Sequence, residues 1–120
     1  MRTTTPVLSA TSIIGDDVKN VEGKDLGEIK DIMIDLDSGR IEYAVLSFGG
    51  FLGLGDKYFA VPFEALRVDT DEECLIMDVS KETLKNAPGF DKDNWPNFAD
   101  PDLRSRLHSH YGITSSRRAA

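Results

Sequence analysis

Residues 31–45, DIMIDLDSGRIEYAV, decide the fold. Apolar and charged side chains alternate on both sides of Asp37-Ser38-Gly39, and a period of two is typical of a half-buried β-strand. Glycine at the end of the loop supplies the positive φ that a tight hairpin turn needs. The stretch therefore predicts one strand over 27–36, a three-residue turn, and a second strand that begins at Arg40.

The two strands of this hairpin differ in their apolar faces. In the first, Ile32, Ile34 and Leu36 share the face that we expect to be buried, opposite two aspartates. The second strand starts with the same alternation, but Leu46 and Phe48 make its other face apolar as well. A strand that is apolar on both faces must be covered on both. This pattern predicts a barrel interior on one side and a partner surface or the tail on the other.

Outward from the hairpin, the sequence predicts further short strands at 58–61, from Val68, and at 75–79. Pro62 marks the end of the first of these, because proline cannot donate to a β-ladder. Together these signals predict a mainly β fold of about five or six short strands, in a small antiparallel sheet that closes into a barrel.

A C-terminal segment follows the predicted barrel, which we place at residues 8–88. Ser80 is a good N-cap for a helix over 81–86, and Asp100 followed by Pro101 begins a second helix that ends near Gly112. An isolated helix of about eleven residues is marginal in water, so its apolar stripe must be covered. We therefore treat 89–120 as a tail that docks on the barrel or on another subunit through Trp95, Phe98, Leu103, Leu107 and Tyr111.

Composition and charge limit the function classes. The chain has 120 residues, of which 40% are apolar, and this predicts one domain with a tail. Residues 15–100 hold 20 acidic against 9 basic side chains, so this body should repel a phosphate backbone. Cys74 is the single cysteine, which excludes an internal disulfide. We expect a cytoplasmic protein with no membrane span and no direct contact with nucleic acid.

The candidate chemical motifs do not complete a catalytic or ligand site. His108 and His110 point about 200° apart on a helix, so they cannot share a metal ion. The Asp35–Gly39 turn lacks the ligands of a calcium loop, and Gly53-Leu54-Gly55 is followed by a strand where a nucleotide loop would open a helix. These departures predict a protein without catalytic residues, metal or cofactor.

Several blocks of sequence, taken in order, resemble the PRC-barrel family. The blocks are residues 13–15, 21–23, 26–29, 35–47, 49–66 and 75–82, with Val18 between the first two. Agreement in order from about Leu8 to Pro88 is more specific than any single motif. The tail from Phe90 lies outside the family pattern.

The resemblance implies a small barrel that acts as a protein-binding module without a shared set of catalytic residues. The family includes the cytoplasmic domain of the photosynthetic reaction centre H subunit and the C-terminal domain of a ribosome-maturation factor. We expect a non-catalytic interaction or assembly module, a homodimer, whose protein partner contacts Phe48, Phe51, Leu52 and Leu54. The alternatives are a ribosome-assembly factor that binds a basic ribosomal protein, and a barrel that binds a small molecule or metal.

Overall fold

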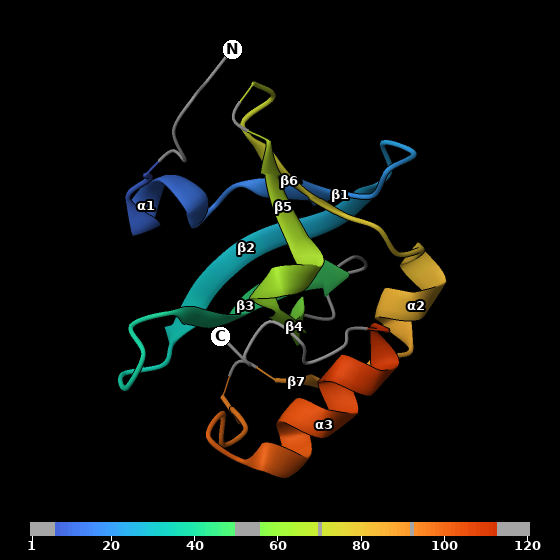
Figure 1. The fold of residues 1–120 in the computed structure, drawn as a ribbon. Helices are drawn as coiled ribbons and strands as arrows, with labels where there is room; N and C mark the ends of the chain where they lie inside the picture. Colours follow the sequence, from blue (N-terminus) through green and yellow to red (C-terminus); the bar gives the residue numbers. More distant parts are fainter. Residues whose placement is uncertain (1–6, 50–55, 70, 92, 113–120) are drawn as a thin grey trace.

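The computed structural model describes residues 7–49, 56–69, 71–91 and 93–112. Strands, helices and one 3-10 turn alternate along these residues (Figure 1). In chain order they are α1 (Ala10–Ile13), β1 (Asp17–Lys19), β2 (Asp25–Ile34), β3 (Ile41–Gly49), β4 (Asp56–Pro62), η2 (Phe63–Ala65), β5 (Leu66–Asp69), β6 (Cys74–Met77), α2 (Lys81–Lys85), β7 (Gly89–Phe90) and α3 (Pro101–His110).

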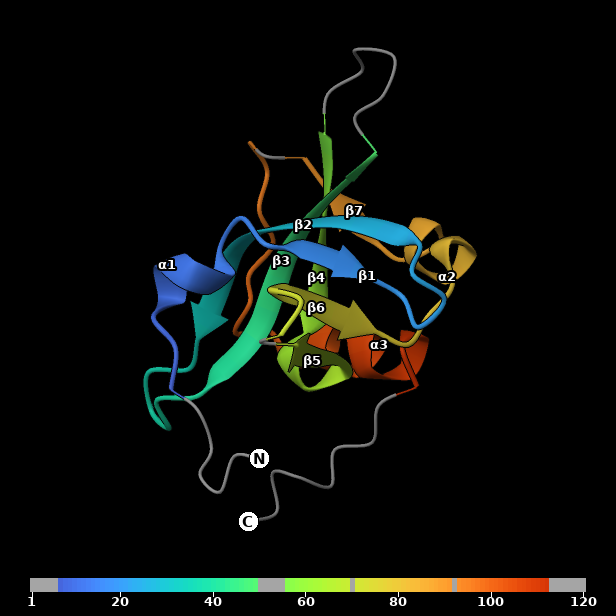
Figure 2. The same ribbon diagram turned by 90° about the horizontal axis from the view of Figure 1, so that it is seen from above.

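The strands form one seven-stranded sheet in the order β5-β6-β1-β2-β3-β4-β7, which confirms the prediction of a mainly β fold. Figure 2 shows β6 between β5 and β1. Pairing is antiparallel except between β1 and β6, which run parallel. Within the described residues the sheet does not close on itself, because β5 and β7 each pair with one neighbour. The sheet thus differs from the closed, wholly antiparallel barrel that the sequence predicts.

The difference begins at the end of β4. Pro62 has no N–H to offer to a further ladder, and the 3-10 turn η2 redirects the chain after it. β5 then pairs with β6 and leaves the outer side of β4 to β7, where Tyr58 pairs with Phe90. β6 returns beside β1 in the same direction, with Val18 opposite Leu75. The 3-10 turn after Pro62 thus takes the chain away from β4, and β5 and β6 extend the sheet beyond β1 instead.

The predicted hairpin is confirmed, because β2 and β3 pair antiparallel and Gly39 has a φ of +77°. The predicted buried face at the end of β2 is wrong. Ile34 and Leu36 are 52% and 92% exposed. The register of β2 against β3 shifts twice, and one of these shifts lies directly before Ile34. A bulge turns the residues that follow it toward the other face, so strict alternation fails at this end of the strand.

The hydrophobic core contains residues of the sheet and of the helices α2 and α3. Residues 43–47 of β3 are buried without interruption, as predicted for a strand covered on both faces. Leu84 of α2 and Leu107 of α3 belong to the same hydrophobic cluster as the sheet residues. α2 and α3 lie side by side (Figure 1), and the His110 ring nitrogen Nε2 contacts the Thr83 carbonyl oxygen at 2.7 Å.

Both predicted helix starts are confirmed. The Ser80 hydroxyl accepts a hydrogen bond from the Thr83 N–H, and the Asp100 carboxylate accepts one from the Asp102 N–H. These caps satisfy donors that the first turn of a helix leaves unpaired. The cap at Asp100 fixes where α3 leaves the preceding linker.

In the described part of the chain, no helix has the length and apolar character that a membrane span requires.

Candidate functional site

The β2–β3 turn, residues 35–40, forms a tightly bonded tip. The Asp35 carboxylate accepts hydrogen bonds from the Asp37 N–H and the Ser38 hydroxyl, at 3.2 and 3.0 Å. The Gly39 N–H donates to the Asp35 carbonyl at 2.7 Å, and the Asp35 N–H donates to the Arg40 carbonyl at 2.8 Å. Because these bonds fix the backbone of the turn, Leu36 is held outward in solvent.

The linker before α3 lies opposite this tip. The Asn97 side-chain oxygen accepts a hydrogen bond from the Ala99 N–H, and the Asn97 carbonyl accepts one from the Asp100 N–H. Phe98 packs against Tyr43 of β3, with ring centroids 5.4 Å apart. Phe98 therefore anchors the linker on the sheet.

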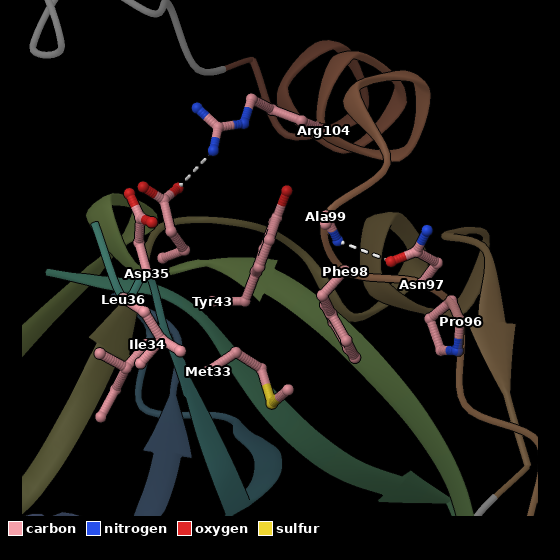
Figure 3. Close-up of a pocket in the computed structure, with 11 residues that line it drawn as sticks. Met33, Ile34, Asp35, Leu36, Tyr43, Pro96, Asn97, Phe98, Ala99 and Arg104 are labelled. Atoms are coloured by element: carbon pink, nitrogen blue, oxygen red, sulfur yellow. Dashed lines mark hydrogen bonds and ion pairs between the residues drawn. The ribbon is translucent and has the colours of Figure 1, made fainter. Parts of the chain in front are cut away.

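The turn and the linker enclose an open cleft of about 600 Å³. Figure 3 shows Ile34, Asp35 and Leu36 on one side, Pro96, Asn97 and Phe98 on the other, and Tyr43 between them. Met33, Glu42, Ala99 and Arg104 complete the lining. We call these residues the hairpin cleft. Its lining combines apolar and aromatic side chains with a few polar groups, as is typical of binding sites.

The polar end of the hairpin cleft is an ion pair. Arg104 of α3 contacts Glu42 of β3 through an Nη2–Oε1 distance of 3.1 Å. Asp35 adds a second carboxylate to the lining, so the acidic groups there outnumber the guanidinium. This charge favours a partner that brings positive charge to the rim.

Tyr43 supplies a buried hydroxyl beside this ion pair. The Arg104 guanidinium lies beside this hydroxyl and can only donate, so the Tyr43 proton has no acceptor among the described residues. Burial raises the pKa of Tyr43, and the Arg104 guanidinium acts in the opposite direction. The phenol is therefore neutral at physiological pH.

A cluster of aromatic rings continues from the cleft along the linker. Trp95 lies within 5.3 to 6.1 Å, centroid to centroid, of Tyr58, Phe90 and Phe98, and it is 39% exposed. Edge-to-face aromatic contacts of this kind stabilise a segment beyond the area that they bury. The linker thus holds Trp95 partly exposed while other aromatic rings pack against it.

The remaining residues predicted for tail docking lie on α3. Leu103, Leu107 and Tyr111 are all buried in the common core. The Tyr111 hydroxyl, like that of Tyr43, has no hydrogen-bond partner among the described residues, and burial raises its pKa. These positions hold α3, and with it Arg104, against the sheet.

Phe48, one of the four residues predicted for partner binding, lies at the other end of β3. Phe48 is partly buried, and its ring packs against Phe59 at a centroid distance of 6.2 Å. Phe51, Leu52 and Leu54 lie outside the described residues. Of this predicted set the structure places Phe48, and Phe48 does not line the hairpin cleft.

The sequence analysis missed the hairpin cleft as a site. Leu36 carried a usable signal, because an apolar residue directly beside a turn is poorly placed to reach a core. Arg104 and Pro96 gave no such signal. Their contribution depends on contacts between positions about sixty residues apart in the chain.

A second hollow, of about 350 Å³, lies beside the β1–β2 turn. Its lining includes four charged residues, Lys19, Arg67, Asp69 and Glu72. Cys74 also lines it, and burial, and then the Asp69 carboxylate, raise the pKa of the thiol. A thiol with a raised pKa stays protonated and is a poor nucleophile.

Metal-ligating side chains do not gather in the part of the chain that the structure describes. Among the residues that it describes, no three His, Cys, Asp or Glu side chains are placed to hold one ion.

Comparisons with known proteins identify the family of the chain. The model of the PRC-barrel domain family matches residues 6–84. No curated protein matches the chain. Among solved structures, the chain is similar to RimM from Pseudomonas aeruginosa, whose name refers to 16S ribosomal RNA processing, with 16% identity and a TM-score of 0.43. That match covers 68% of this chain, which spans about half (49%) of the RimM chain. Because the family model covers well over half of its residues, the chain belongs to the PRC-barrel domain family.

Proposed function

We propose that this protein is a non-catalytic interaction module that binds a partner protein in the hairpin cleft. The observation that carries the proposal is the exposed apolar surface around the cleft, where Ile34 and Leu36 face Phe98 across the hollow. Water-exposed apolar residues grouped at a hollow mark interaction sites far more often than single exposed residues do. The PRC-barrel segment, residues 8–88, supplies the hairpin, and the tail, residues 89–120, supplies the opposite wall.

The expected mode of binding is apolar complementarity with a charged rim. Burying one large apolar side chain contributes about 1.5 to 3 kcal/mol. The net charge of −7 and the carboxylates of Asp35 and Glu42 favour a partner with basic residues around its apolar contact. The loop set Phe48, Phe51, Leu52 and Leu54 remains the competing surface for the same function.

Affinity capture from a native, nuclease-treated lysate tests the proposal with four purified chains. The intact protein is compared with Leu36→Asp, with Leu52→Asp and with Val21→Asp. Val21 is a matched control, because it is also an exposed apolar residue beside a turn of β2, 60% exposed. We expect a protein that the intact chain and the Val21 variant retain and the Leu36 variant loses.

Two results would contradict this assignment. Loss with Leu52→Asp and retention with Leu36→Asp would place the partner on the loop. Equal retention by all four chains would exclude both the hairpin cleft and the loop as the binding surface. If the captured protein is a basic ribosomal protein, the pathway is ribosome assembly and the cleft assignment is unchanged.

A further inference from the structure

β5 is an open edge of the sheet. It pairs with β6 on one side, and in the described part of the chain no strand pairs with its other side (Figures 1 and 2). An open edge presents N–H and C=O groups that another strand can pair with. Every copy of the chain carries the same four-residue edge, Leu66–Asp69.

The two faces of β5 have opposite chemistry. Leu66 and Val68 lie opposite the fully buried Met77 and Leu75 of β6, so they face the core. Arg67 and Asp69 alternate with them and face outward. In an antiparallel pair, core-facing residues of one strand must lie opposite core-facing residues of the other. Because the faces alternate along a strand, only every second register meets this condition.

Both charged residues of the edge can form further ion pairs or hydrogen bonds. Within the described residues, Arg67 makes no ion pair. Asp69 uses its Oδ1 atom to accept from the Asp71 and Glu72 N–H groups, and its Oδ2 atom makes no hydrogen bond there. A strand that brings the opposite charges would satisfy both side chains.

We propose that two copies of this chain pair antiparallel through β5, with Val68 opposite Val68 of the second copy. This register places Arg67 opposite Asp69 of the second copy, and the two-fold symmetry makes the pair twice. The neighbouring face-matched registers place Arg67 opposite Arg67, or Asp69 opposite Asp69, and like charges directly opposite destabilise a sheet. Of the three registers whose two-fold axis passes through residue 67, 68 or 69, the one centred on Val68 is therefore favoured by the charges.

An exposed apolar residue beside the edge adds contact area. Leu8 is 44% exposed and lines a hollow of about 310 Å³ together with Val68 and Asp69. A four-residue edge buries less than the roughly 800 Å² per partner that is typical of a stable complex. The dimer is therefore weak and depends on protein concentration. It shares no residue with the hairpin cleft, so either surface can fail without the other.

Sedimentation equilibrium of the full chain, over about a hundred-fold range of concentration, tests the proposal. We expect the mass to rise above the 13.3 kDa of one chain as the concentration increases. Arg67→Glu and Asp69→Lys should each raise the dimer dissociation constant at least about tenfold, because the changed pair occurs twice. Lys85→Glu, which makes the same charge change as Arg67→Glu but at the exposed end of α2, should leave the constant unchanged.

The decisive experiment is to mix the Arg67→Glu and Asp69→Lys chains. In the mixture the glutamate introduced into one chain meets the lysine introduced into the other, while the unchanged Asp69 of the first meets the unchanged Arg67 of the second. Both pairs are then attractive again. We expect the mixture to dimerise like the parent although neither variant does so alone, which loss of folding cannot produce. A parent that stays monomeric at every concentration, variants that dimerise like the parent, or a mixture that does not recover would each overturn the proposal.

Discussion

The two turns at the ends of β2 have similar construction and different surroundings. In the β1–β2 turn, residues 20–24, the Asn20 side-chain oxygen accepts from the Glu22 and Lys24 N–H groups. In the β2–β3 turn, Asp35 does the same for its own neighbours. Each turn exposes one apolar residue, Val21 or Leu36. An exposed apolar residue at a turn is therefore not by itself the sign of a site.

The surroundings distinguish the two turns. Val21 borders a hollow whose lining includes Lys19, Arg67 and the carboxylates of Asp69 and Glu72. Leu36 borders a larger hollow lined by Met33, Phe98 and other apolar groups. Apolar residues grouped around a concave surface gain more from a partner than a single apolar residue among charges does. This difference is why we assign binding to the second turn.

The largest expected effect comes from removing the support of the hairpin cleft. Leu107→Ala should lower the free energy of unfolding by about 2 to 5 kcal/mol, because Leu107 is fully buried and its loss leaves a cavity under α3. Chemical denaturation measures the change. Ser105→Ala, on the exposed side of the same helix, is the control and should have almost no effect. Equal effects would mean that α3 does not pack as described.

A smaller loss of stability is expected from substitutions in the two turns, and it should differ between them. Asn20 is buried, so Asn20→Ala leaves two N–H groups without their acceptor and should cost about 1 to 3 kcal/mol. The corresponding bonds of Asp35 are exposed, and Asp35→Ala should cost about 0.5 to 1 kcal/mol. Urea unfolding of both variants compares them. A larger loss at Asp35 would reverse the ranking of the two turns.

The two buried tyrosines provide a matched pair. Tyr43→Phe and Tyr111→Phe should leave stability unchanged or raise it by up to about 1 kcal/mol, because each removes a buried hydroxyl without a partner. Of the two, Tyr43 lines the hairpin cleft, so only Tyr43→Phe is expected to alter partner binding. Thermal unfolding measures the first effect and titration with the captured partner measures the second. Destabilisation by either change would show that the hydroxyl is satisfied in solution.

The raised pKa values of these tyrosines also predict a pH dependence. A folded-state pKa above the ordinary 10.0 means that stability is fully present below pH 10 and is lost as the pH rises through the folded-state pKa. Each Phe variant should therefore lose less stability than the parent in alkali. Denaturation at a series of alkaline pH values checks the slope, and identical slopes would contradict the burial of the phenols.

The smallest expected effect is at Asp16, near the beginning of β1. Burial, then the charge of Glu73 and that of Asp17, raise the pKa of Asp16 above its ordinary value of 3.8. Its contribution to stability is thus present below pH 3.8 and is lost as the pH rises through the folded-state pKa. Asp16→Asn should raise the melting temperature slightly at neutral pH and not in acid. A variant that is less stable at neutral pH would contradict this sign.

Local patterns predicted much of the fold. The alternation on both sides of Asp37-Ser38-Gly39 predicted the hairpin, and the Asp100-Pro101 start predicted α3. Such signals depend on a few neighbouring residues, so they are visible in the chain itself. The two-residue strand β7 offered no comparable signal, because it forms only through its pairing with β4.

The site was much less predictable. The alternation predicted a buried Leu36, whereas the register shifts of β2 leave it in solvent. The facing wall consists of Pro96, Phe98 and Arg104, which reach the hairpin through packing between distant parts of the chain. A hydrophobic pattern gives the face of a strand, and it does not give the angle at which a distant linker crosses that face.

The central claim is that the partner binds at the β2–β3 end of β2 and not at the β1–β2 end. The most direct test is the amide NMR spectrum of the isotope-labelled chain, titrated with the purified protein that the capture experiment identifies. We predict shifts at residues 33–36 and 97–99, and none at residues 20–24. Shifts confined to residues 20–24, or to Phe48 and the loop after it, would contradict the account.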